Sequence, residues 1–407
     1  MKNANDQKHI VLAWELGSNY GHLSKMLTLT RPFISKGYKV SFILRDLSHV
    51  QQLGVPDNIN IYQSPFISGK QSAQYAPTNY SDILLGVGYS DLNKFVGALR
   101  GWITLFELLK PDLLICDHSP TALLAAKANG CKVVNFGTGF ELVDLHEPFA
   151  SLRLWEKVPQ SSLVAADQSL LIKINKALKL NQKKGYSNLK SAFTVDQSYL
   201  CTLPELDPYI GRKNTPYWGP LMEMGSGVTP VWPKQDGFKV FVYVRPDIKI
   251  MLHLIKAMMS LNLSVLIHCI GGYTPKIDGI QNLENIHICE KPLNMSEIVK
   301  QADLILCHGG HGTVANALLA GIPLLLFPTQ QEQKNTAVRL TNLGVALELK
   351  GQESQQQLKK KLNSFIKQEQ FKSNMNVLKD KYQDFNITEL VEDISQRCID
   401  LCEEKNE

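Results

Sequence analysis

The chain has 407 residues, of which 44% are hydrophobic and 20% are charged, and its formal net charge is +5. This balance excludes a disordered chain, and since no apolar run approaches ~18 residues we predict no transmembrane segment. Lys and Arg are scattered along the sequence, which argues against nucleic acid as the main partner. The length favours two domains of about 200 residues each.

The eight cysteines are dispersed along the chain and form no C-x-x-C pair. We therefore predict reduced thiols in a reducing compartment. The polar amino terminus, MKNANDQKH, shows no signal-peptide pattern. Together these features predict a cytoplasmic protein, and they leave open a peripheral contact with a membrane.

The first half of the chain alternates apolar, strand-like runs with helical patterns. The expected strands are residues 9–14, 39–44, 112–117 and 131–136. A helix is expected from Gly21 to its stop at Gly37. A long helical region is expected over 81–110, before Pro111, and residues 141–200 are looser and mostly helical.

Residues 217–236 are rich in Pro and Gly and carry no periodicity, so we expect a linker there. The alternation then starts again. The expected strands of the second half are residues 238–244, 263–270, 285–289, 302–308 and 322–328. Helices are expected near 247–261 and from Glu332, and the end of the chain is polar and helical.

This alternation predicts an α/β fold of parallel sheets with helices on both faces. We expect residues 1–216 to form one Rossmann-like domain and residues 237–385 to form a second. Whether a C-terminal helix over 386–407 returns to the first domain stays open. Ligands in such folds bind at the carboxyl ends of the strands, so two domains facing across a cleft would enclose a ligand.

The motif H-G-G-H-G-T follows a buried strand and opens a helix. Gly309, Gly310 and Gly312 allow a backbone to approach closely, and the N–H groups at a helix start attract anions. Thr313 adds a hydroxyl group, and His308 can donate a hydrogen bond to a phosphate oxygen. The turn therefore suits a diphosphate, although a glycine turn is also compatible with a purely structural role.

The motif is followed by G-I-P, a further proline and the pair Glu332–Gln333. This set strongly resembles the donor-binding signature of GT-B glycosyltransferases, the family that includes the macrolide and UDP-glycosyltransferases. The resemblance implies that His308, Gly310 and Thr313 hold the diphosphate, and that Glu332 and Gln333 contact sugar hydroxyls. An alternative for Glu332 is stabilisation of the helix dipole. The expected donor site comprises His308, Gly309, Gly310, Gly312, Thr313, Asn316, Glu332 and Gln333.

The chain departs from the family pattern in two places. Asn316 stands where many members have a Glu that grips both ribose hydroxyls, which bears on the preference for base or sugar. Thr336 stands where an Asn is usual, and Asn335 lies one place earlier.

The segment WELGSNYGHL, residues 14–23, runs from a strand into a helix through two glycines. It resembles the G-H element of the family, whose His is the general base, and this role carries over to His22. The chemistry needs a neutral imidazole, and a helix N-terminus disfavours the charged form. The alternative is a histidine that only packs at the helix start.

A base needs an orienting partner. The resemblance implies an Asp at the end of a later first-domain strand, and Asp117 ends the strand over 112–117. Asp112 begins the same strand and would lie at the opposite edge of the sheet. His118 is expected near the cleft as a bystander, and Asp46 either caps the second strand or lines the acceptor mouth.

No Asp-x-Asp motif occurs in the sequence, and Glu205–Asp207 is the only acidic pair with that spacing. We therefore predict a metal-independent reaction without a cofactor, in which a nucleotide-diphosphate sugar is the co-substrate. Helix dipole and backbone N–H groups would stabilise the leaving diphosphate. Arg245 follows the strand over 238–244 and either reaches the phosphates or is an exposed loop arginine.

The resemblance implies an inverting hexosyltransferase that moves a sugar from a UDP- or dTDP-sugar to a hydroxyl of a small-molecule or lipid acceptor. Two alternatives remain open: a sugar-nucleotide 2-epimerase of the same fold, and a non-catalytic GT-B-like partner protein. The helical region 81–110, with Trp102 and Phe106, either lines an apolar acceptor site or faces the core.

Overall fold

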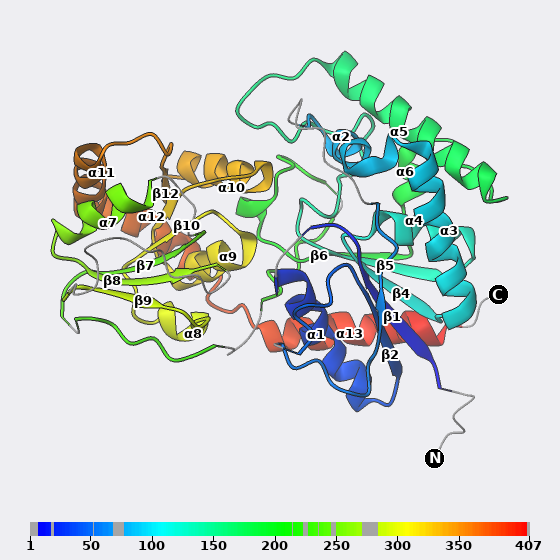
Figure 1. Ribbon diagram of the computed structural model, residues 1–407, viewed down its shortest axis with the longest axis horizontal. Helices are drawn as coiled ribbons and strands as arrows, with labels where there is room; N and C mark the ends of the chain where they lie inside the picture. The colour runs from blue at the N-terminus through cyan, green and yellow to red at the C-terminus, as the bar shows by residue number, and fades with distance from the viewer. Residues whose placement is uncertain are drawn as a thin grey trace. The chain divides into compact units, whose positions relative to one another are not determined.

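The computed structural model describes residues 7–17, 20–51, 53–67, 77–213, 215–222, 227–234, 236–245, 250–270 and 284–404 (Figure 1). Met1–Glu223 and Asn386–Glu407 together form one compact unit, and Met224–Phe385 form another. The division falls inside the stretch 217–236 that is expected to be a linker.

The first unit contains a parallel sheet in the order β3-β2-β1-β4-β5-β6. Its strands are β1 His9–Trp14, β2 Lys39–Leu44, β3 Asn60–Gln63, β4 Leu113–Asp117, β5 Lys132–Gly137 and β6 Gln197–Leu200. The strand order reverses between β1 and β4, where Trp14 pairs with Asp117. The loops that follow these two strands therefore leave the same edge side by side, which is where doubly wound sheets bind ligands.

Helices cover both faces of this sheet (Figure 1). They are α1 Tyr20–Ser35, α2 Tyr80–Leu84, α3 Leu92–Leu109, α4 Pro120–Ala128, α5 Gln160–Leu180, α6 Leu189–Phe193 and α13 Ile387–Glu403. Helix α1 packs against α13, and α3 packs against α4 and α5. Strands β1 and β4 are buried along their whole length, which explains why both read as continuous apolar runs.

The helical region expected over 81–110 is interrupted. A π-helical turn, Leu85–Tyr89, separates α2 from α3, and Gly88 within it has a φ of 126°. A Cβ at Gly88 would overlap the side chain of Ile67, so only glycine fits this turn. Trp102 and Phe106 on α3 are buried in the core of the unit, so the core interpretation of this helix is correct.

The second unit contains a parallel sheet in the order β12-β11-β10-β7-β8-β9. Its strands are β7 Lys239–Val244, β8 Ser264–Cys269, β9 Ile286–Cys289, β10 Leu304–Cys307, β11 Leu324–Leu326 and β12 Ala346–Glu348. The order reverses between β7 and β10, where Cys307 pairs with Tyr243. The glycine turn after β10 therefore lies at the ligand-binding edge of this sheet.

The helices of the second unit are α7 Met251–Met259, α8 Met295–Ile298, α9 His311–Ala320, α10 Gln331–Asn342, α11 Gln355–Lys367 and α12 Glu369–Lys381. Helix α11 packs against α7, and α12 packs against α9. The predicted fold class, an α/β protein with two Rossmann-like parallel sheets, is confirmed.

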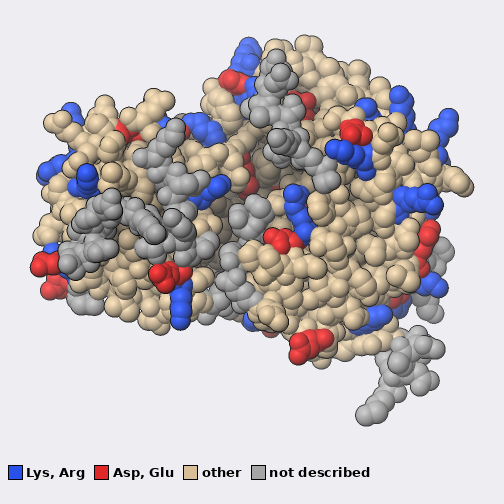
Figure 2. Space-filling view, in the orientation of Figure 1, with Lys and Arg blue, Asp and Glu red and all other residues tan. Residues whose placement is uncertain are grey.

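Surface charge and cysteine pairing also bear on the sequence-based predictions. The described basic and acidic side chains are interspersed on the face drawn in Figure 2. All eight cysteines lie in the described ranges and are free thiols. Among the helices of the described residues, none combines the length and the apolar composition needed to cross a membrane.

Candidate functional site

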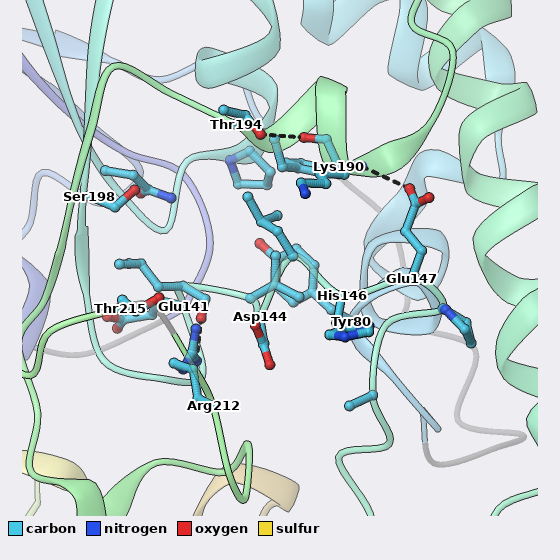
Figure 3. Close-up of a pocket in the computed structure, with 18 of the residues that line it drawn as sticks. Tyr80, Glu141, Asp144, His146, Glu147, Lys190, Thr194, Ser198, Arg212 and Thr215 are labelled. Atoms are coloured by element: carbon cyan, nitrogen blue, oxygen red, sulfur yellow. Dashed lines mark hydrogen bonds between the residues drawn. The ribbon is translucent and has the colours of Figure 1, made fainter.

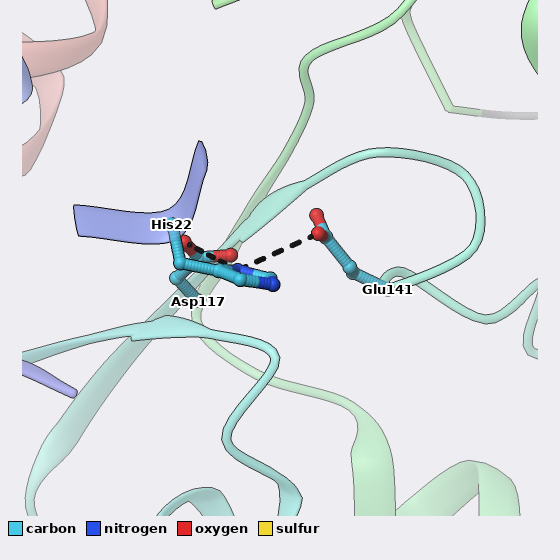
Figure 4. Close-up of side chains that lie close together, drawn as sticks. All are labelled: His22, Asp117 and Glu141. Atoms are coloured by element: carbon cyan, nitrogen blue, oxygen red, sulfur yellow. Dashed lines mark hydrogen bonds and ion pairs between the residues drawn. The ribbon is translucent and has the colours of Figure 1, made fainter. Parts of the chain in front are cut away.

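The start of helix α1 brings His22 to the carboxyl end of β4. The Nδ1 atom of His22 lies 3.1 Å from Oδ2 of Asp117, and both residues are buried (Figure 4). Strand pairing causes this proximity, because Asp117 is the last residue of β4 and Trp14 is the last of β1. The structure thus brings together the two residues that the sequence singled out as base and orienting partner.

Trp14 and Gly17 hold the imidazole ring of His22 in place. The Trp14 ring stacks on it with centroids 5.1 Å apart. Gly17 has a φ of +93°, and a Cβ there would overlap Nε2 of the histidine. The glycine before the helix is therefore needed both for its backbone conformation and for the space that it leaves for the ring.

Two further charged residues complete this cluster, and the sequence reasoning missed both. Lys25 Nζ lies 3.2 Å from Oδ1 of Asp117 and 3.1 Å from both carboxylate oxygens of Glu141. Glu141 Oε1 in turn lies 3.7 Å from Nδ1 of His22 (Figure 4). The signal for Lys25 was its place three residues after His22 on a helix, which puts both on one face.

The charges in this cluster stabilise one another. Burial alone would lower the pKa of Lys25, but the carboxylates of Asp117 and Glu141 outweigh it and hold that pKa above its usual range. Burial alone would raise the pKa of Glu141, but Lys25 holds it well below its usual range. At neutral pH Lys25 is therefore an ammonium group and Glu141 an ionised carboxylate.

Glu141 is fixed by the loop that follows β5. Its Oε2 accepts a hydrogen bond from the backbone N–H of Thr138 at 2.6 Å. A Cβ at Gly137 would overlap the same carboxylate. Arg212 braces the loop from the other side, since it donates to the carbonyl oxygens of Gly139 and Leu142.

His118 lies beside the cluster in a strained backbone conformation. Its φ is 47°, and its ring centroid lies 6.4 Å from that of His22. Burial lowers the pKa of His118 to about 4, so the ring is neutral at pH 7. Its Nε2 is buried and has no hydrogen-bond partner in the described structure.

The two other aspartates considered from the sequence lie away from this cluster. Asp112 accepts from Lys8 Nζ at 2.9 Å and from the backbone of His9, at the amino end of the sheet. Asp46 accepts from the backbone N–H and the hydroxyl of Ser48, so it caps the turn after β2.

A cavity of about 1110 Å³ opens beside the cluster within the first unit (Figure 3). Both His118 and Glu141 line it, and the loops after β4 and β5 and the segments around α6 form its walls. Its polar lining includes Asp144, Lys190 and Arg212. No residue of α3 lines this cavity.

Glu15 is a buried carboxyl directly after β1. Its Oε2 accepts from the backbone N–H of Thr121 at 2.8 Å, and its Oε1 accepts from the hydroxyl of the same residue. Burial raises the pKa of Glu15 from its ordinary 4.5 to about 7.

We expect Glu15→Gln to stabilise the protein at alkaline pH and to leave its stability nearly unchanged at acid pH. A carboxyl whose pKa rises on folding contributes stability below its unfolded pKa of 4.5, and loses it as pH rises through about 7. The loss amounts to roughly 3 kcal/mol. Urea unfolding of both proteins at about pH 5 and about pH 8.5 measures it, and an equal difference at both values contradicts it.

In the second unit, His308 braces the backbone at the end of β10. Its Nδ1 lies 2.7 Å from the carbonyl oxygen of Phe327, and its Nε2 accepts from the backbone N–H of Arg245 at 2.8 Å. The proton of this neutral ring is therefore on Nδ1 and points to Phe327. The expected donation from the His308 ring to a phosphate does not fit this arrangement, because the ring shapes the turn instead.

The glycine turn opens directly into helix α9. Gly309 has a φ of +94° and packs against the backbone of Gln333, where a Cβ would lie 3.3 Å from its carbonyl oxygen. Gly310 is the N-cap residue, with no side chain to bond the helix start. Gly312 and Thr313 follow in the first turn. A Cβ at Gly310 or Gly312 would meet open space, so a ligand can approach their backbone N–H groups.

The remaining expected donor residues have partners of their own. The Asn316 side chain donates to the carbonyl oxygen of Gly312 at 2.8 Å. Gln333 Oε1 accepts from the backbone and the hydroxyl of Thr329, which leaves its amide nitrogen for a ligand. Glu332 lies in the first turn of α10, and Asn335 on the same helix is a buried amide without a hydrogen-bond partner in the described structure.

Three ligand atoms of His22, Asp117 and Glu141 lie within 4.8 Å of one another, a spacing that could suit a metal ion. Lys25 Nζ already bonds both carboxylates at 3.1 to 3.2 Å. A cation bound there would compete with the ammonium group, so the cluster is better suited to hold a proton than a metal.

The known proteins that this chain resembles are glycosyltransferases. Residues 252–392 match the Glycosyltransferase family 28 C-terminal domain. An uncharacterized glycosyltransferase of Methanosarcina mazei is 24% identical over 82% of this chain and 84% of its own. The NDP-glycosyltransferase YjiC of Bacillus subtilis is 22% identical over 82% of this chain and 83% of its own.

Solved structures of glycosyltransferases share the whole fold. The glycosyltransferase VinC, in complex with dTDP, superposes with a TM-score of 0.70 at 15% identity, covering 97% of this chain and 99% of its own. The spinosyn rhamnosyltransferase SpnG, complexed with spinosyn aglycone, has a TM-score of 0.68 at 16% identity, covering 94% and 99%. With two doubly wound sheets, the matching domain and these relatives, the chain has the GT-B fold, and its residues 252–392 carry a glycosyltransferase family 28 C-terminal domain.

Proposed function

We propose that this protein is an inverting, metal-independent hexosyltransferase that moves a sugar from a UDP- or dTDP-sugar to a hydroxyl of a small-molecule or lipid acceptor. The observation that carries the proposal is the contact between His22 and Asp117 at the carboxyl edge of the first sheet. The cavity beside them supplies room for an acceptor, and the turn before α9 supplies N–H groups for a diphosphate.

His22 is the general base of this reaction. Because its Nδ1–H points to Asp117, Nε2 is the nitrogen that takes the proton from the acceptor hydroxyl. The acceptor oxygen then forms a bond to the anomeric carbon of the donor, and the bond from that carbon to the diphosphate oxygen breaks. A single displacement inverts the anomeric configuration, and the electron pair leaves on the diphosphate.

The first turn of α9 would receive this diphosphate. Backbone N–H groups at a helix start point at an anion, and the helix dipole favours its charge without a metal. Gly310 and Gly312 leave open space there, and Thr313 adds a hydroxyl to the same turn. VinC, whose structure contains dTDP, and SpnG, whose structure contains spinosyn aglycone, support a nucleotide donor and a small-molecule acceptor.

A thermal-shift series with UDP, dTDP, GDP and ADP, each with and without EDTA, tests the proposal. A ligand that binds the folded state raises the melting temperature, by several degrees when it exceeds its dissociation constant about a hundredfold. We expect a rise with UDP or dTDP that EDTA does not change. A rise that EDTA abolishes contradicts the metal-independent reaction, and no rise with any nucleotide favours a non-catalytic protein.

A further inference from the structure

The cluster around His22 carries a definite charge, which the reaction changes. Asp117 and Glu141 each bring one negative charge and Lys25 brings one positive charge, so the cluster has one unit of negative charge while His22 is neutral. When His22 takes a proton the net charge becomes zero. The cluster therefore passes from an uncompensated charge to a balanced one at the step where the base acts.

The positions of Lys25 and Glu141 make this balance effective. The side chains of Lys25, Asp117 and Glu141 are 11%, 0% and 8% exposed, so water screens their charges weakly. The two carboxylates approach Nδ1 of His22 from different elements. Asp117, at the end of β4, lies 3.1 Å from it, and Glu141, in the loop after β5, lies 3.7 Å from it. Lys25 comes from α1, one turn after His22, and joins them.

We propose that Lys25 and Glu141 are positioning residues that set the charge around His22, so that the base is neutral before the reaction and stabilised once it is protonated. This inference rests on the proposed function of His22 as the general base. Without Lys25 two uncompensated carboxylates would hold a proton on His22 at neutral pH. Without Glu141 the imidazolium would lose one of the two charges that balance it.

Two other ionisable groups near the cluster, His118 and Cys201, do not change this count at neutral pH. Burial lowers the pKa of His118 to about 4, so it stays neutral. Burial raises the pKa of the Cys201 thiol to about 12, so it stays protonated. The carboxyl group of Glu15 is held by the backbone N–H and the hydroxyl of Thr121.

The test uses Lys25→Met, Glu141→Gln and the double variant, with the pH dependence of kcat/KM as the readout. Lys25→Met leaves two negative charges, so the acidic limb of the pH profile should move up by about one pH unit or more, and activity at a fixed pH on that limb should fall about tenfold. Glu141→Gln leaves no net charge, so the limb should move down. The double variant restores one negative charge, so its limb should return toward that of the native protein.

The matched control is Lys8→Met, which removes a lysine paired with Asp112 at 2.9 Å at the opposite edge of the same sheet. It should leave the pH profile unchanged. Each variant is first shown to be folded by its melting temperature and its shift with UDP.

The inference is overturned if the acidic limb of the pH profile lies at the same pH in all folded variants. It is also overturned if the limb of the double variant is shifted as far from that of the native protein as the limb of Lys25→Met. If Lys25 and Glu141 had a purely structural role, the losses of kcat/KM in the single variants would add in the double variant, and its acidic limb would not return toward that of the native protein. If His22→Ala is as active as the native protein, the proposed function fails instead.

Discussion

Replacing His22 with alanine is expected to lower the rate of sugar transfer by roughly 10²- to 10⁴-fold, the usual contribution of a general base. The acceptor hydroxyl then has no nitrogen to receive its proton as it attacks the anomeric carbon. Nucleotide binding should persist, because the proposed diphosphate turn lies in the other unit, before α9. Single-turnover transfer and the thermal shift with UDP measure the two effects separately.

Two further variants sharpen this expectation. Asp117→Asn should also slow transfer, because an amide can donate to Nδ1 and turn the imidazole to the wrong tautomer. His253→Ala is the matched control, since this histidine lies on α7 in the second unit, where its Nδ1 contacts the carbonyl oxygen of Glu353. Unchanged transfer in His22→Ala would remove the base from the mechanism.

The apolar runs of the sequence predicted the sheets, and the family resemblance singled out the pair of His22 and Asp117. Buried parallel strands read as continuous apolar runs, and residues at their carboxyl ends meet at one edge. Asp117 ends such a run and His22 follows the first one after a glycine loop. The pairing of β1 with β4 in the folded sheet then explains why the two residues meet.

Lys25 and Glu141 could not be predicted in this way. Glu141 lies 116 residues from Lys25 in the chain, and its place depends on the loop conformation after β5. That loop is set by Gly137 and by the bonds from Arg212, neither of which gives a pattern in the sequence. A charge in a loop is usually solvated, so only the fold shows that this one is buried.

The role of His308 also needed the structure. A histidine beside a glycine turn reads as a ligand for phosphate, but its tautomer depends on the partners of both nitrogens. These partners, the carbonyl of Phe327 and the N–H of Arg245, come from the ends of neighbouring strands. Only their positions in the folded sheet assign the proton to Nδ1.

Replacing Gly310 with aspartate is expected to make the protein more stable and its donor binding much weaker. Gly310 is the N-cap of α9, has a φ of −64°, and gives the helix no side-chain cap. Aspartate is among the best N-cap residues and adds about 1 kcal/mol by accepting from the first-turn N–H groups. These are the same groups that the diphosphate would use, so the carboxylate both occupies and repels the site.

The two effects of Gly310→Asp should therefore have opposite signs. The melting temperature without ligand should rise by a few degrees, while the dissociation constant for UDP should rise on the order of a hundredfold. Gly310→Ser adds a cap without a charge and should weaken binding less. Gln368→Asp places the same carboxylate at the N-cap of α12, which also lacks a side-chain cap, and should leave UDP binding unchanged.

Isothermal titration with UDP and thermal unfolding of the same preparations measure both quantities. A Gly310→Asp variant that binds UDP as the native protein does would show that the diphosphate is held elsewhere. A loss of binding together with a loss of stability would point to misfolding of the turn, and Gly310→Ser distinguishes the two, because it caps the helix without adding charge. Gly310 thus tests the donor site, because a helix cap and a bound anion at this position would accept hydrogen bonds from the same N–H groups.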